Sequence, residues 1–206
     1  QFRGNEGQVD QGECEYEAIT EDTFASVPPF RPAPDDASVQ KAVDILQKAA
    51  RPIIVSGGGV KASGAGAELV ALAERLAIPV VTSLNGKDTF PSTHPLSGGV
   101  VGTYSRESAN RAVNEADLVC FIGTETGGMT THFWAVPEIG RPAIQIDIEP
   151  ESIGRNYTLQ AAVQGDAKVT LARMVDLSDA GTAASRTVWV ERIKELQGEW
   201  RAKHED

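Results

Sequence analysis

The chain of 206 residues carries 29 acidic and 19 basic side chains, and its formal net charge is −10. This balance excludes a nonspecific nucleic-acid binder, which needs clustered Lys and Arg against phosphates. No apolar run approaches the roughly 20 residues that a membrane helix requires. We therefore expect neither nucleic acid nor a membrane as a partner.

Cysteine and histidine usage indicates no metal centre. Cys14 and Cys120 form neither a disulfide framework nor a CxxC pair, which favours a reducing, cytoplasmic location. His94, His132 and His204 are far apart in the sequence and lack metal-ligand spacing. The sequence predicts no metal ligand in this chain.

The first 34 residues are typical of a connection rather than a domain. They contain no apolar signal-peptide core. The stretch SVPPFRPAP, residues 26–34, places four prolines within nine residues, which favours extended backbone and forbids a regular helix. We interpret residues 1–34 as the end of a preceding domain plus an interdomain linker, within a segment of a longer polypeptide.

A helix is predicted immediately after the linker. In DDASVQKAVDILQKAA, residues 35–50, the apolar positions recur at helical spacing. Asp36 or Ser38 is expected to cap its amino end, because their side-chain oxygens accept otherwise unpaired backbone N–H groups. Arg51 precedes Pro52 and is therefore pushed out of the helical region, which ends the helix.

Strands and helices then alternate along the chain. Buried strands are expected at residues 52–56, 78–84, 118–124, 142–150 and 161–166, and helices at 64–77, 105–116 and 167–175. Strands rich in Val and Ile without polar alternation are typical of a sheet covered on both faces, and alternation with helices indicates parallel pairing. The sequence predicts a doubly wound, Rossmann-like α/β domain over residues 35–177, with a mostly parallel sheet.

The remaining residues, 178–206, are predicted to be a linker and a last helix. SDAGTAAS is a small-residue stretch, and residues 187–205 form an amphipathic pattern. Trp189, Ile193, Leu196 and Trp200 share one stripe of that helix, so it should dock on an apolar surface.

The residues that directly follow each predicted strand, which we call the strand exits, are the candidate ligand-binding positions. Ligands of open α/β sheets bind at the carboxyl ends of strands. The first exit fits G-x-G-x-x-A, which suggests a dinucleotide cradle, although a tight glycine turn explains it equally well. The candidate residues along the successive exits are Gly57, Gly58, Gly59, Thr82, Ser83, Leu84, Thr124, Asp147, Ile148 and Asp166.

The lack of an acid at the second exit argues against an ordinary NAD dehydrogenase. The ribose-binding acid of that fingerprint should end the second strand, which instead ends Thr82-Ser83-Leu84. Asp147, after the fourth strand, could accept hydrogen bonds from a ribose or adenine group, or could cap a turn before Pro150. Asp166 could contact a ligand or cap the helix that begins near Ala167.

No catalytic residue is predicted. Ser56 and Ser83 have no histidine nearby in sequence, and the GxSxG pattern is absent. Glu125 lies among threonines in a loop, where a carboxylate is usually solvated. No nucleophile, base and orienting group form a recognisable set.

The ordered exits resemble the central domain of thiamine-diphosphate enzymes of the acetolactate synthase and oxalyl-CoA decarboxylase type. The similarity covers residues 38–177, and its most specific stretches are IPVVTSLNGKDTFPSTHPLSGG and IDIEPESIGRNY. It implies the middle part of a three-domain 2-keto acid decarboxylase or carboligase. The residues after 177 would then lead to an absent carboxyl-terminal domain. The resemblance also implies a homodimeric or homotetrameric parent enzyme.

The resemblance implies where cofactors belong. Thiamine diphosphate and Mg²⁺ would be held by the other two domains. The nearest sequence here to the GDG motif is Gly165-Asp166-Ala167, which lacks the glycine of the third position. The central domain would hold FAD or ADP, or nothing. Carried over by position, the nucleotide would be lined by Gly58, Gly59, Thr82 to Leu84, Gly102, Thr124, Asp147 and Ile148.

One departure counts against FAD. The third exit reads GTETGGMTTH, where FAD-binding members have an Arg-containing loop suited to bidentate phosphate contact. Glu125 stands in that loop, and Lys61 or Arg155 would have to compensate. The alternative function is a self-standing NAD(P)-binding module or oxidoreductase, and a third hypothesis is a purely architectural domain.

Overall fold

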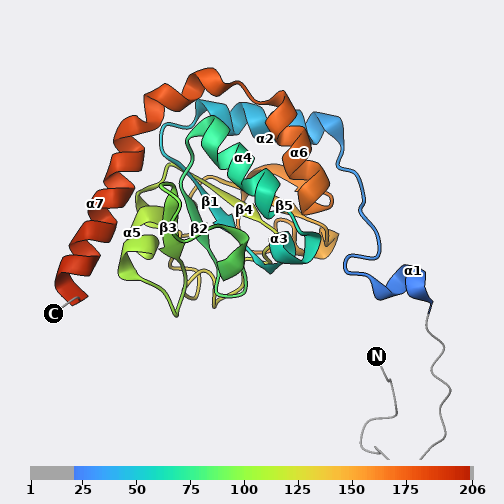
Figure 1. Cartoon of the computed structure of the whole chain (residues 1–206), viewed down its shortest axis with the longest axis horizontal. Helices are drawn as coiled ribbons and strands as arrows, with labels where there is room; N and C mark the ends of the chain where they lie inside the picture. The colour runs from blue at the N-terminus through green and yellow to red at the C-terminus, as the bar shows by residue number, and fades with distance from the viewer. Residues whose placement is uncertain (1–20, 205–206) are drawn as a thin grey trace, which may run out of the picture.

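A single parallel sheet of six strands organises the chain in the computed structural model, which describes residues 21–204 (Figure 1). The strand order is β3-β2-β1-β4-β5-β6, and every pairing is parallel. The order reverses between β1 and β4, which is the arrangement of dinucleotide-binding folds. The strands are β1 Pro52–Ser56, β2 Val80–Thr82, β3 Ser97–Val100, β4 Leu118–Ile122, β5 Ala143–Asp147 and β6 Leu159–Gln164. The predicted fold class is confirmed.

Helices cover both faces of this sheet. On one face lie α2 (Asp36–Lys48), α4 (Gly66–Leu76) and α6 (Ala167–Leu177), and on the other lie α5 (Glu107–Glu115) and α7 (Thr187–His204). The short elements are α1 Asp22–Ala25, α3 Gly58–Ser63 and the 3₁₀ turns η1 Lys87–Thr89, η2 Pro150–Ser152 and η3 Ala180–Arg186. None of the helices in residues 21–204 is long and apolar enough to cross a membrane.

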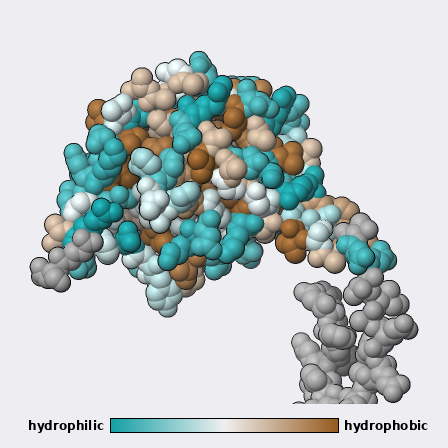
Figure 2. All heavy atoms as spheres, in the orientation of Figure 1, coloured by the Kyte–Doolittle hydropathy of each residue, from teal (hydrophilic) through white to brown (hydrophobic). Residues whose placement is uncertain are grey.

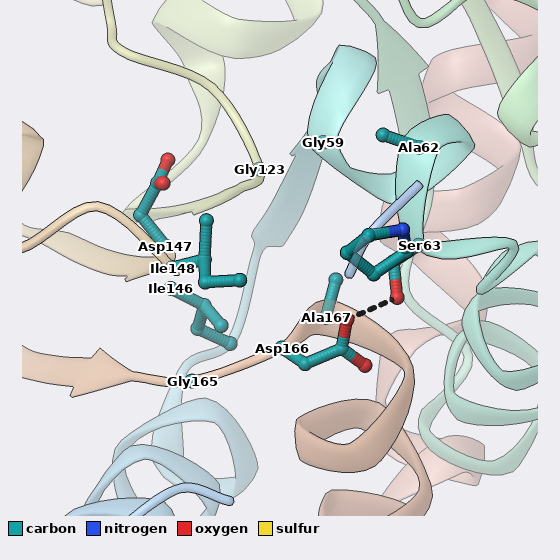
Figure 3. Close-up of a pocket in the computed structure, with 11 residues that line it drawn as sticks. Gly59, Ala62, Ser63, Gly123, Ile146, Asp147, Ile148, Gly165, Asp166 and Ala167 are labelled. Carbon is teal, nitrogen blue, oxygen red and sulfur yellow. Dashed lines mark hydrogen bonds between the residues drawn. The ribbon is translucent and has the colours of Figure 1, made fainter. Parts of the chain in front are cut away.

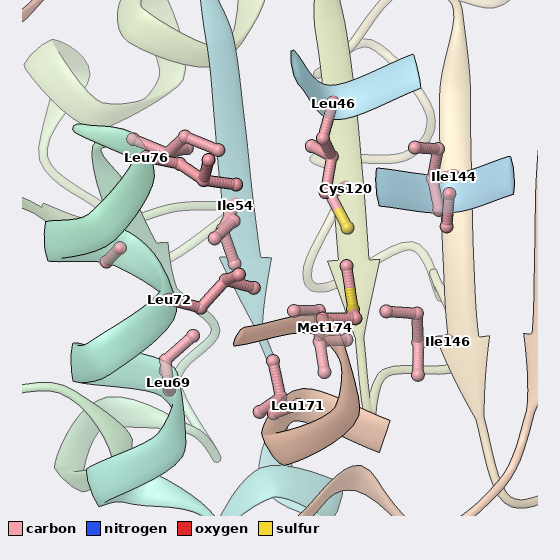
Figure 4. Close-up of a cluster of buried hydrophobic side chains, with 14 of the residues drawn as sticks. Leu46, Ile54, Leu69, Leu72, Leu76, Cys120, Ile144, Ile146, Leu171 and Met174 are labelled. Atoms are coloured by element: carbon pink, nitrogen blue, oxygen red, sulfur yellow. The ribbon is translucent and has the colours of Figure 1, made fainter. Parts of the chain in front are cut away.

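Each face buries its own apolar cluster against the sheet. Figure 4 shows Leu69, Leu72 and Leu76 of α4 lying beside Ile54, with Leu171 and Met174 of α6 nearby. Cys120 belongs to this cluster, and burial raises the pKa of its thiol to about 12, so it remains protonated at neutral pH. Figure 2 shows hydrophilic residues over much of the outer surface, with apolar residues between the helices.

Three features differ from the sequence predictions. The cap of α2 is Asp35, whose carboxylate accepts the Ser38 N–H at 2.8 Å. The prediction of Asp36 or Ser38 was therefore wrong, because both residues lie inside the helix. Strand β3 was not predicted, because SGGV has two glycines that weaken any strand pattern. Helix α3 begins within the glycine triplet, with Gly57 as its N-cap and Gly58 as its first residue, and was also not predicted.

The last helix docks on the sheet of its own domain. Trp189, Ile193 and Leu196 are buried, and the Trp189 indole N–H donates to the carbonyl oxygen of Pro52 at 2.8 Å. Trp200 is half-buried, and the Arg106 guanidinium lies 4.9 Å from its ring centroid. The predicted apolar stripe is therefore the docking surface, and Figure 1 shows α7 beside α5 and β3.

A fully buried arginine joins this C-terminal segment to the helices across the domain. The Arg186 guanidinium donates to the carbonyl oxygens of Leu46 and Ala49 at the end of α2, and to that of Leu76 at the end of α4. These carbonyls have no partner within their own helices, and the negative ends of two helix dipoles favour a cation there. One side chain therefore satisfies two helix ends.

We expect R186A to lower the free energy of unfolding by about 3 kcal/mol or more, because several buried carbonyl groups lose a charged donor. The matched control is R173A. Arg173 is partly exposed and pairs with Asp36 at 2.9 Å, so its loss should cost no more than about 1 kcal/mol. Urea unfolding measures both variants. Equal losses of unfolding free energy would contradict the stabilising role of the Arg186 hydrogen bonds, which we call the Arg186 clamp.

Candidate functional site

The exits of β1 and β4 touch through their glycines. The Gly57 N–H donates to the Ile122 carbonyl oxygen at 2.8 Å, and the Gly59 N–H donates to the Gly123 oxygen at 2.9 Å. A Cβ on Gly57 would lie 2.2 Å from the Gly123 oxygen, so no larger residue fits there. Two of the three glycine N–H groups therefore serve strand packing and are not available to a phosphate.

Two hollows meet at this contact, and both are lined by Gly59 and Gly123. We call the first the inner slot; it is mainly apolar (Figure 3). The inner slot is lined by Pro28, Gly59, Ala62, Ser63, Gly123, Ile146, Asp147, Ile148, Gly165, Asp166 and Ala167. The second, the outer cleft, is lined by Gly58, Gly59, Ser83, Asn85, Gly123, Thr124, Glu125 and the loop from Gly127 to Thr130.

Most of the predicted site residues gather in these two hollows. Gly59, Asp147, Ile148 and Asp166 line the inner slot, whereas Gly58, Ser83 and Thr124 line the outer cleft with Gly59. The two residues that flank Ser83 behave differently. Thr82 and Leu84 open on a separate cleft at the far side of the β2 exit, because successive residues of an extended segment face opposite ways.

Two predicted residues, Gly57 and Gly102, line neither hollow, and they matter because the backbone packs closely around them. Gly102, with φ +111°, lies against the loop of the outer cleft, where an added Cβ would be 2.2 Å from the Met129 carbonyl oxygen. The Gly102 N–H donates to the Asn110 side chain at 2.9 Å, which fixes the backbone of Gly102 where it approaches Met129. Gly102 thereby sets the position of the loop that closes the outer cleft.

Asp166 is the buried hub of the inner slot. Its carboxylate accepts the N–H groups of Lys168 and Val169 at 3.1 and 3.2 Å, and so it caps α6 as the capping alternative predicted. It also accepts the Ser63 hydroxyl at 2.8 Å, drawn in Figure 3, and the Arg31 guanidinium at 3.0 Å. Its acceptor capacity is used within the protein, which leaves little for a ligand or a metal.

Residues 28–32, which were predicted as part of a linker, form one wall of the inner slot. Pro28 lines the slot, Arg31 also donates to the Ser63 carbonyl oxygen at 2.9 Å, and the Asp166 N–H donates to the Pro32 carbonyl oxygen at 2.9 Å. Arg31 and Ser63 were not predicted as site residues. The Arg31–Asp166 pair joins positions 135 residues apart, and no local pattern reveals such a contact.

Asp147 lies on the other side of the inner slot from Asp166 (Figure 3). Its carboxylate accepts the Glu149 N–H at 3.0 Å. Burial raises the pKa of Asp147 above its ordinary value, and the nearby charges of Glu125 and Glu149 act in the same direction. Asp147 therefore orders the turn before Pro150, and it faces the slot as well.

The outer cleft presents hydroxyl and backbone groups but no cation among its lining residues. Its one ionisable residue is Glu125, on a loop that Asn156 holds by donating to the Thr126 hydroxyl at 3.0 Å and the Glu125 carbonyl oxygen at 3.1 Å. Lys61 is instead paired with Asp88 at 2.7 Å, and Arg155 lines neither hollow. In residues 21–204 no group of three His, Cys, Asp or Glu could hold a metal ion.

We expect G57A to lower the free energy of unfolding by more than about 2 kcal/mol, because the added methyl group would push the β1 and β4 exits apart. G58A is the matched control. Its Cβ would meet Asn85 Cβ at 3.5 Å, an ordinary contact, so its stability should change by less than about 1 kcal/mol. Denaturant titration of both variants tests the packing role, and similar stabilities would refute it.

The raised pKa of Asp147 predicts a pH-dependent penalty. The folded protein binds this proton more tightly than the unfolded chain does, so wild type loses stability as pH rises from the ordinary pKa through the raised one. D147N removes the charge and keeps an acceptor for the Glu149 N–H. We expect D147N to be at least as stable as wild type at pH 7, and to lose this advantage toward about pH 4. A variant less stable than wild type at both values would contradict the assignment.

Comparison with known proteins identifies the family. The model of the thiamine pyrophosphate enzyme central domain matches residues 39–174. The chain is 36% identical over 194 residues to a Methanocaldococcus jannaschii protein named as a probable acetolactate synthase large subunit, a match that covers 92% of this chain and 32% of that protein. It is 33% identical over 174 residues to the glyoxylate carboligase of Escherichia coli O157:H7, which covers 82% of this chain and 29% of that protein.

A solved structure agrees at the level of the fold. An enzyme from Mycobacterium smegmatis, assigned as thiamin diphosphate-dependent, matches with a TM-score of 0.61 and 24% identity, over 82% of this chain and 31% of that one. The chain thus spans about a third of the length of these relatives. The predicted resemblance is confirmed: the chain belongs to the family of thiamine pyrophosphate enzyme central domains.

Proposed function

We propose that the chain works as the central domain of a longer, cytoplasmic thiamine-diphosphate-dependent 2-keto acid decarboxylase or carboligase. The named activities of its relatives, acetolactate synthase and glyoxylate carboligase, support this class of reaction. Its partners would be the amino- and carboxyl-terminal domains of the same polypeptide, in a homodimer or homotetramer. We assign no catalytic residue to this chain.

Thiamine diphosphate and Mg²⁺ do not fit the residues that the structure describes. The only sequence that approaches the diphosphate motif is Gly165-Asp166-Ala167. Asp166 is 1% exposed, and its carboxylate already binds Arg31, Ser63 and the first turn of α6. In the proposed parent enzyme this cofactor and its metal would therefore be held by the other domains.

We also propose that the domain holds an adenine nucleotide, FAD or ADP, across the contact between β1 and β4. The observation that carries this proposal is the meeting of the two hollows at Gly59 and Gly123, at the reversal point of the strand order. The apolar inner slot suits a flat adenine ring, with Ile148 and Ala167 among its walls. The diphosphate would then cross Gly59 into the outer cleft.

Charge limits the affinity of this site for a diphosphate. The outer cleft offers only the neutral hydroxyl donors of Thr124 and Ser83, and the Ser83 hydroxyl also accepts the Gly86 N–H at 3.0 Å. Glu125 adds a negative charge where phosphates would lie, and no Lys or Arg among the lining residues offsets it. We therefore expect weak binding that improves when this charge is removed.

The NAD(P)-linked alternative has less support. Strand β2 ends at Thr82, with no acid at the position that would bind a ribose, and Thr82 does not line either nucleotide hollow. Membership of the central-domain family also favours FAD or ADP over NAD(P) in this proposal.

Fluorescence titration of the chain with FAD, ADP and NAD tests the nucleotide proposal. We expect FAD or ADP to bind and E125Q to tighten that binding roughly fivefold, which corresponds to about 1 kcal/mol. E138Q is the matched control, because Glu138 is exposed in the same β4–β5 loop but lines neither hollow. Tight binding of NAD without FAD or ADP would favour the dehydrogenase alternative, and no binding at millimolar ligand would favour an architectural domain.

A further inference from the structure

A third cleft lies at the β3 edge of the sheet, between the β2 exit and the second half of α7. We call it the basic cleft, because Lys87, Arg106, Lys194 and Arg201 all line it. Leu84 and Tyr104 add exposed apolar surface to its walls. The basic cleft lies on the opposite side of the β2 exit from the outer cleft, since Thr82 and Leu84 face it, whereas Ser83 and Asn85 face the outer cleft.

The charge of this cleft is opposite to that of the whole molecule. The chain has a net charge of −10, yet no Asp or Glu lines the basic cleft. Elsewhere, described cations are commonly paired with acids, as in Arg111–Glu199 at 2.7 Å and Lys203–Glu107 at 3.3 Å just beside it. Within residues 21–204, Lys87, Arg106 and Arg201 form no ion pair, and Lys194 is paired with Glu191.

The elements that carry these cations are held in place. Arg106 lies against the Trp200 ring, which joins the start of α5 to the end of α7. The Gln197 side chain donates to the Ser97 carbonyl oxygen and so fastens α7 to β3. Cations that line one cleft repel one another, and the repulsion is relieved when an anion binds between them.

We propose that the basic cleft binds a small anion that carries a diphosphate group, at a site separate from the nucleotide crevice, by which we mean the inner slot and the outer cleft together. The three cations without an ion pair, Lys87, Arg106 and Arg201, suit the two to four negative charges of such a group, and Lys194 adds a fourth cation that it shares with Glu191. Hydroxyl groups of Ser92 and Thr93 in the lining supply further donors. A long polyanion is disfavoured, because beyond the cleft it would meet the excess negative charge of the protein.

The test is titration of the ¹⁵N-labelled 206-residue chain with inorganic pyrophosphate, followed by amide NMR and calorimetry. We expect shifts in the amides around Lys87, Arg106 and Arg201. The K87Q/R201Q double variant should bind pyrophosphate at least tenfold more weakly, and neither side chain forms an ion pair or hydrogen bond in residues 21–204 that folding would lose. K41Q is the control, because Lys41 is exposed on α2 and does not line the cleft.

Several outcomes would overturn the proposal. One is unchanged affinity in K87Q/R201Q, and a second is a shift map centred on Gly58 and Thr124 instead of the basic cleft. A third is binding no tighter than that of sulfate at equal ionic strength, which would indicate an adventitious ion only. R106Q provides a second variant, with thermal unfolding to separate lost binding from lost folding. Changes in the amide signals of Gly58 and Thr124 on addition of FAD or ADP report binding at the nucleotide crevice. The nucleotide proposal and the basic-cleft proposal are therefore tested independently.

Discussion

The close approach of the β1 and β4 exits is the constraint on which the rest of the site depends. Two backbone N–H groups of the glycine triplet are donated across this contact, and a side chain at Gly57 or Gly59 would separate the strands. The contact lies at the reversal of the strand order, where an open parallel sheet forms its ligand crevice. The same glycines that resemble a phosphate cradle are therefore needed first to close the sheet, and only Gly58 of the three is left free of strand packing.

Two buried charged side chains, Asp166 and Arg186, hydrogen-bond to parts of the chain that are distant in sequence. Asp166 joins the linker, α3 and α6 at the inner slot, and Arg186 joins α2, α4 and the last helix at the opposite end. Because a nucleotide in the inner slot would contact a wall that the linker supplies, its binding and the position of the preceding segment would be coupled in the proposed parent enzyme. A charged group that leaves water needs such a complete set of partners.

Charge divides the carboxyl edge of the sheet into two regions. Glu125 lines the outer cleft and Asp147 lines the inner slot, whereas the basic cleft beyond the β2 exit is lined by Lys87, Arg106, Lys194 and Arg201. The chain segment Thr82–Asn85 separates them and presents alternate residues to each side. The segment Thr82 to Leu84, which was predicted to line a single nucleotide, is thus divided between the outer cleft and the basic cleft.

The sequence by itself determined the fold class, the principal helices and strands, the apolar stripe of α7 and the family. Those properties follow from apolar periodicity and ordered exit motifs, which are local in the chain. Most of the site residues that it predicted line the inner slot or the outer cleft, because strand exits of a parallel sheet meet at one edge. Only the tertiary structure decided that Asp35 caps α2, that SGGV pairs as an edge strand, and that Thr82 and Leu84 face away from Ser83. Arg31–Asp166 and the Arg186 clamp were equally invisible, because contacts between residues more than a hundred positions apart depend on how the layers pack.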